Sequence, residues 1–183
     1  TQTALELSSR IAGLEDAQFS FIVPGGQAAI ALVYFAYCVT GSHALVPYSA
    51  YGPNKEMAEG LMKGLGVEVE AYDPLIGAGI SELIRENTAL IWTESPGSVT
   101  MDVQDVPAIV EAAHARGVAV ALDNTYAAGV LFDAFAHKVD VSIQALTKYV
   151  GGHSDILLGS VSVRDQAGFE ALGPVYRQLG LAV

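Results

Sequence analysis

A run of five aliphatic residues, Val118-Ala119-Val120-Ala121-Leu122, most constrains what this chain can fold into. The run follows a predicted helix that stops at Gly117, and a turn sequence beginning at Asp123 comes directly after it. A strand that is apolar on both of its faces is typical of a parallel sheet with both faces covered. The run therefore predicts a buried central strand in an α/β domain.

The rest of the chain alternates strand-like and helix-like segments. Further strands are predicted at residues 19–23, 44–47, 67–71, 90–92, 139–143 and 156–163. Helices are predicted at residues 5–14, 28–38, 54–65, 80–85, 106–115, 131–136 and 166–179. Strands that alternate with helices over short loops imply a mostly parallel sheet between two layers of helices. Residues 1–183 are thus expected to form one three-layer αβα domain.

Charge and composition exclude several classes of protein. The chain has 9 Lys and Arg against 20 Asp and Glu, a formal net charge of −11. Binding to nucleic acid or to an anionic membrane surface needs clustered cations, so neither is an expected partner. The longest apolar run is broken at residues 40–43, before it reaches the length of a membrane span. The single cysteine, Cys38, excludes an intramolecular disulfide, and a cytoplasmic location is expected.

Two candidate binding features follow the first two predicted strands. Gly25-Gly26-Gln27 lies between a strand and a helix, where free backbone N–H groups can bind phosphate and glycine lets the anion come close. A plain turn would use the same glycines. Tyr51 lies in the loop after the second strand, where an aromatic ring can stack on a planar cofactor. A tyrosine half-buried in a loop is the alternative.

Two further features follow later strands, and ligands of open α/β sheets gather at such strand ends. Asp123 ends the buried strand, and its carboxylate could pair with a protonated pyridine nitrogen or cap the following turn. Lys148 follows residues 139–143 and lies among apolar and small residues, which can reduce the hydration of an amine. Such a lysine can form a Schiff base, although a solvated lysine in a glycine-rich turn is the alternative. Thr147 could donate its hydroxyl to a phosphate.

Several segments resemble the Cys/Met-metabolism family of pyridoxal-phosphate (PLP) enzymes. The similarity is strongest in Asp123-Asn124-Thr125-Tyr126 and in the stretch from Leu146-Thr147-Lys148-Tyr149 to Asp155. Residues 73–78, 94–101, 105–110 and 123–132 are similar to the bacterial β-lyase branch of that family. The resemblance extends from about Gln18 to the end of the chain and implies the large domain of a fold-type I PLP enzyme.

The resemblance also implies roles for individual residues. Lys148 would form the Schiff base with PLP and remove the substrate α-proton, and Asp123 would pair with the pyridine nitrogen. Tyr51 would stack on the ring and take part in proton transfer. The phosphate would be bound by the backbone amides of Gly26 and Gln27 and by the hydroxyl of Thr147. No role is carried over to Ala145 and Ser98, where many family members have Ser and Asn.

Members of the family are longer than this chain. By the resemblance, an N-terminal arm that reaches a neighbouring subunit and a C-terminal domain that binds the substrate carboxylate lie outside residues 1–183. These residues are therefore expected to be the PLP-binding large domain of a homo-oligomer, a tetramer by the resemblance. Without those segments, the isolated chain is expected to have little activity.

The function implied by the resemblance is β-elimination from an amino-acid thioether, L-cystathionine, as a step of methionine biosynthesis. Cystathionine γ-lyase, cystathionine γ-synthase and methionine γ-lyase are alternatives within the family, and an inactive fragment is an alternative outside it. A nicotinamide-binding domain is disfavoured because no Gly-x-Gly-x-x-Gly follows the first strand. The four histidines have no ligand-like spacing, so no metal site is expected.

Overall fold

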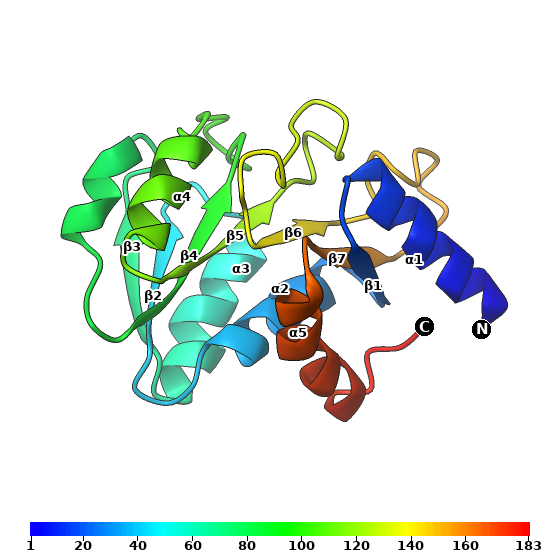
Figure 1. The fold of residues 1–183 in the computed structure, drawn as a ribbon, viewed down its shortest axis with the longest axis horizontal. Helices are drawn as coiled ribbons and strands as arrows, with labels where there is room; N and C mark the ends of the chain where they lie inside the picture. The colour runs from blue at the N-terminus through cyan, green and yellow to red at the C-terminus, as the bar shows by residue number, and fades with distance from the viewer.

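A seven-stranded sheet forms the middle layer of the structure, a computed structural model that describes residues 1–183 (Figure 1). Its strands are β1 (Phe19–Val23), β2 (His43–Pro47), β3 (Glu68–Tyr72), β4 (Thr88–Glu94), β5 (Ala119–Asp123), β6 (Val141–Gln144) and β7 (Gly159–Val163). Their order is β1-β7-β6-β5-β4-β2-β3. Strands β2 to β6 pair in parallel, whereas β7 runs antiparallel to both β1 and β6. The predicted mostly parallel sheet is confirmed.

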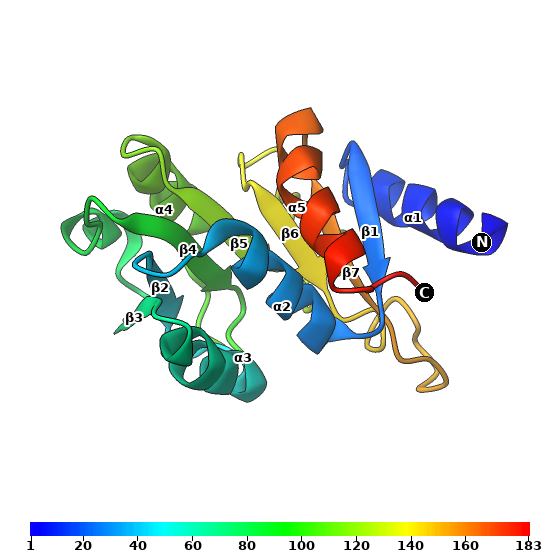
Figure 2. The same cartoon turned by 90° about the horizontal axis from the view of Figure 1, so that it is seen from below.

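Helices cover both faces of this sheet (Figure 2). One face carries α1 (Gln2–Leu14) and α4 (Val106–His114), and the other carries α2 (Gly26–Tyr37), α3 (Gly52–Glu56) and α5 (Gln166–Gln178). A 3-10 helix, Gly77–Glu82, packs beside α4. No helix combines the length and the apolar composition needed to cross a membrane. The three-layer αβα architecture agrees with the sequence.

Strand β5 is buried because its residues alternate between two hydrophobic cores. Val120 and Leu122 pack in the core under α4, and Ala121 packs in the core under α2. Trp92 of the neighbouring β4 is also fully buried and stacks on Tyr34 of α2, with ring centroids 5.4 Å apart. Burial on both faces is the physical reason for the continuous aliphatic run, and the predicted central strand is confirmed.

The helix predicted over residues 131–136 is wrong, because this segment forms turns. The carbonyl of Phe132 accepts a hydrogen bond from the Asn124 side chain (3.2 Å), and the Asp133 carboxylate accepts from the amide three residues later (2.9 Å). Such side-chain bonds compete with the backbone pattern of a helix. Leu131 is 83% exposed. Only Ala134 and Phe135 of this segment are buried, which is little packing to stabilise a helix over six residues.

Two other elements differ from their predicted bounds near the site. The helix expected over residues 54–65 already begins at Gly52, where Pro53 suits the first turn, and continues as a π-helical segment, Met57–Met62. The strand expected over residues 156–163 begins only at Gly159. The residues just before Gly159 form a loop instead, and Leu157 of this loop lines the cavity described below.

Candidate functional site

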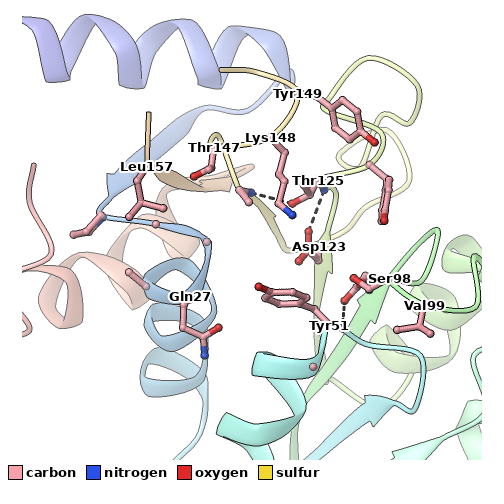
Figure 3. Close-up of a pocket in the computed structure, with 18 of the residues that line it drawn as sticks. Gln27, Tyr51, Ser98, Val99, Asp123, Thr125, Thr147, Lys148, Tyr149 and Leu157 are labelled. Atoms are coloured by element: carbon pink, nitrogen blue, oxygen red, sulfur yellow. Dashed lines mark hydrogen bonds between the residues drawn. The ribbon is translucent and has the colours of Figure 1, made fainter. Parts of the chain in front are cut away.

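A cavity of about 1130 Å³ opens at the carboxyl ends of β4, β5 and β6, beside the N-terminus of α2 (Figure 3). Parallel strands end at the same edge of a sheet, so side chains that follow them converge there. The residues singled out from the sequence all line this cavity: Gly26, Gln27, Tyr51, Asp123, Thr147 and Lys148. The structure therefore brings together residues that are up to 122 positions apart in the chain, from Gly26 to Lys148.

The wall formed by α2 offers backbone amides. Gly25 is the N-cap of α2 and provides no capping side chain, and the first amides of a helix have no intrahelical partner. The turn is tightly packed, since a Cβ on Gly26 would lie 3.0 Å from the Cβ of Ala145. A Cβ on Gly159 would lie only 2.4 Å from the carbonyl oxygen of Gly25. Free amides at the positive end of a helix form a site suited to an anion.

Two carboxyl groups lie side by side at the floor of the cavity. Glu94 and Asp123 are the last residues of β4 and β5, and they are paired in the register of the two strands. Glu94 is 2% exposed; its Oε2 accepts the backbone N–H of Tyr51 (2.8 Å), and its Oε1 accepts the hydroxyl of Ser98. Oδ1 of Asp123 accepts the backbone N–H of Thr125 (3.0 Å). Each of these donors stabilises a charged carboxylate.

Burial and mutual repulsion disfavour two negative charges at this floor. Burial, followed by the charge of Asp123, raises the pKa of Glu94 to about 7, against the opposing hydrogen bonds from Ser98 and Tyr51. Burial also raises the pKa of Asp123, which the hydrogen bonds of Thr125 and the charge of Lys148 partly offset. A cationic group of a ligand would relieve this repulsion.

Lys148 lies in the turn that follows β6, and its side chain extends into the cavity toward Asp123 (Figure 3). The turn is fixed by backbone bonds from Lys148 N to Ala145 O (2.9 Å) and from Gly152 N to Lys148 O (2.9 Å). The ammonium group makes no hydrogen bond or ion pair. The side chain is exposed, so in this chain the expected loss of hydration does not occur. Nζ of Lys148 is therefore accessible to a ligand in the cavity.

The other predicted residues have partners of their own. The hydroxyl of Thr147 donates to Leu158 O (3.1 Å) and accepts from Leu158 N (3.1 Å). It thereby joins the turn that carries Lys148 to the residue just before β7. The amide group of Gln27 donates to Pro53 O (3.1 Å) and links α2 to α3. The ring of Tyr51 is 41% exposed and lines the cavity. A bond from Thr147 to phosphate stays a prediction.

The sequence reasoning missed two residues that shape the site. Glu94 appears only within a segment similar to the family, although it lies two residues after the predicted strand at residues 90–92. The rule that ligands gather at the carboxyl ends of strands could have identified Glu94. The hydroxyl of Thr125 accepts the amide of Ala145 (2.9 Å) while its own N–H holds Asp123. Thr125 thereby joins the ends of β5 and β6, a contact that has no signature in the sequence.

Comparisons with known proteins agree with this geometry. The family described as Cys/Met metabolism PLP-dependent enzyme matches residues 1–183. A putative cystathionine beta-lyase of Rhizobium johnstonii is 49% identical over 88% of this chain and 41% of its own length. Cystathionine beta-lyase MetC of Escherichia coli is 42% identical over 87% of this chain and 41% of its own length.

A solved structure has the same fold. Cystathionine gamma-lyase from Lactobacillus plantarum, complexed with L-serine, superposes with a TM-score of 0.96 at 27% identity, covering 100% of this chain and 48% of the other. The chain thus spans less than half the length of the proteins that it matches. The family match over all 183 residues shows that the chain belongs to the Cys/Met-metabolism family of enzymes, whose cofactor is pyridoxal 5'-phosphate.

Proposed function

We propose that this protein is a PLP-dependent carbon–sulfur lyase that cleaves L-cystathionine by β-elimination, giving homocysteine, pyruvate and ammonia. The observation that carries the proposal is the convergence of Lys148, Asp123, Tyr51 and the free amides of α2 on one cavity. The names of the two relatives support the β-lyase reaction rather than another reaction of the family.

The groups that line the cavity fit the cofactor. The uncapped N-terminus of α2 suits a phosphate, and the Gly26 and Gln27 amides are proposed to bind it. The carboxylate of Asp123 suits a protonated pyridine nitrogen, which would also relieve its repulsion with Glu94. The ring of Tyr51 offers a face for stacking, and the unpaired amine of Lys148 suits a carbonyl. The residues present therefore match each chemical part of PLP.

We assign the proton transfers to this chain's own side chains. Bound PLP supplies an electron-withdrawing ring that accepts the electron pair left at the substrate Cα. Nζ of Lys148 takes the α-proton, and the electron pair at Cα then forms a Cα–Cβ double bond while the Cβ–S bond breaks with both of its electrons leaving on sulfur. Water hydrolyses the released enamine to pyruvate and ammonia. Lys148 or the hydroxyl of Tyr51 returns a proton to the thiolate. Asp123 keeps the ring nitrogen protonated throughout.

The activity is proposed for the whole enzyme, because the chain spans 41% of each of the two relatives. We propose that residues 1–183 act as its cofactor-binding large domain and that the enzyme is a homotetramer. Large apolar side chains are exposed beside the cavity, which supports contact with another subunit: Val99, Tyr149 and Leu157.

The reaction is tested by incubating the full-length enzyme with L-cystathionine and identifying the keto acid formed. β-Elimination yields pyruvate, whereas γ-elimination yields 2-oxobutyrate and cysteine. The γ-lyase is the second candidate, favoured by the TM-score of 0.96 with a solved γ-lyase. If 2-oxobutyrate is the main product, the β-lyase assignment is wrong. The Lys148→Ala variant should lose the visible absorbance of covalently bound PLP, and retention of that band would exclude Lys148 as the PLP lysine.

A further inference from the structure

Glu94 connects two loops that form one wall of the cavity. Its carboxylate accepts the backbone N–H of Tyr51 on one oxygen and the hydroxyl of Ser98 on the other. The two loops also touch directly, since Ser98 N donates to Ser49 O (3.2 Å). A Cβ on Gly97 would lie 2.8 Å from the Cβ of Ser49. The loops are therefore packed tightly around one buried charged group.

The residue held on one side of this carboxylate is Tyr51, whose ring faces the cavity. Tyr51 is the N-cap of α3, and its side chain makes no hydrogen bond there. The bond from its backbone N–H to Glu94 (2.8 Å) is thus the polar contact that ties this residue to the sheet. A bond to a charged carboxylate is about twice as strong as one to a neutral group.

We propose that Glu94 is a positioning residue whose carboxylate fixes Tyr51 and Ser98 at the cavity wall, and that protonation of Glu94 weakens the hold on Tyr51. The two partners respond differently to a proton on Glu94. The hydroxyl of Ser98 can rotate and accept that proton in a new hydrogen bond. The N–H of Tyr51 can only donate, so its bond changes from charge-assisted to neutral.

The surrounding charges decide when this change occurs. Burial is the main effect that disfavours the carboxylate of Glu94, and the charge of Asp123 on β5 acts in the same direction. Lys148 from the turn after β6 and Glu15 from the end of α1 act on Asp123, with opposite signs. The phenol of Tyr51 lines the same cavity on the α3 side. Burial and the charge of Asp123 raise the pKa of Glu94 to about 7, so the hold on Tyr51 responds to pH near neutrality.

A consequence for cofactor binding rests on the proposed function. A cationic ring nitrogen beside Asp123 would cancel the repulsion between the two carboxylates and favour the charged form of Glu94. Binding of the cofactor would then strengthen the bond between Glu94 and Tyr51. The residue that stacks on the ring would be fixed by the same event that brings the ring into the cavity.

The test follows the amide of Tyr51 in the ¹⁵N-labelled chain by NMR between pH 5 and pH 9, without cofactor. In the wild type, the Tyr51 amide shift should titrate with a midpoint near the pKa of Glu94, about 7. Asp123→Asn should lower that midpoint, and Glu94→Gln should abolish the transition. Glu111→Gln, which removes an exposed carboxylate on α4, should leave it unchanged. A wild-type amide that does not titrate in this range, or a transition that persists in Glu94→Gln, overturns the proposal.

A second measurement separates this inference from the proposed function. The Kd for PLP should rise about three- to tenfold in Glu94→Gln relative to Glu111→Gln, as expected when one charge-assisted bond becomes a neutral one. An unchanged Kd would refute positioning of Tyr51 for the cofactor. Lys148→Ala should lose covalently bound PLP but keep the Tyr51 transition. If the transition is present and PLP does not bind the wild type, the proposed function fails and the role of Glu94 stands.

Discussion

Replacing Glu94 by Gln should change how the stability of the protein depends on pH. Folding raises the pKa of the Glu94 carboxyl from 4.5 to about 7, so between these values the folded state binds more protons than the unfolded state. The free energy of unfolding must then fall as pH rises through this window. At about 1.4 kcal/mol per pH unit, the contribution of this group falls by about 3 kcal/mol between pH 4.5 and pH 8. A glutamine has no such proton to lose.

Chemical denaturation at pH 5, 6, 7 and 8 checks this prediction. Trp92 is the only tryptophan and is fully buried, so its fluorescence reports unfolding directly. Relative to pH 8, the wild type should gain about 2.5 kcal/mol more at pH 5 than Glu94→Gln does. Glu111→Gln, an exposed control, should follow the wild type. Parallel pH profiles for wild type and Glu94→Gln, or a wild type that gains stability with rising pH relative to the variant, would refute the reasoning.

Three further substitutions test the packing that supports the site. Gly159→Ala places a Cβ 2.4 Å from Gly25 O and should lower the free energy of unfolding by about 1–3 kcal/mol. The same change should weaken PLP binding, and an unchanged Kd for PLP would contradict the role of this turn. Gly13→Ala, in α1 with no atom within 4 Å of the added Cβ, should instead stabilise by about 0.5–1 kcal/mol, and any loss would be unexpected. Tyr34→Phe removes the buried bond to Asn54 (2.8 Å) and should cost about 1–3 kcal/mol, measured by the same denaturation; a neutral effect would mean that Asn54 finds another partner.

Much of the architecture follows from local patterns in the sequence. Both faces of β5 are buried, so all of its positions except the last are aliphatic, and the pattern is visible without a structure. Gly117 and Gly66 mark the ends of helical segments because both adopt a positive φ that other residues rarely tolerate. Residues 131–136 have a helical composition, but hydrogen bonds from distant Asn124 and local Asp133 hold them in turns. Helix propensity depends on residue type alone, so it does not include these hydrogen bonds.

The sequence alone determined the α/β class and the set of Gly26, Asp123 and Lys148 as candidates, because each depends on residue type and order along one segment. Only the tertiary structure decided which strand ends are neighbours. The pairing of β4 with β5 places Glu94 beside Asp123 and couples their charges. It also decided that the Thr147 hydroxyl bonds to Leu158. Repulsion and hydrogen bonding depend on distances between segments, which the order of residues does not contain.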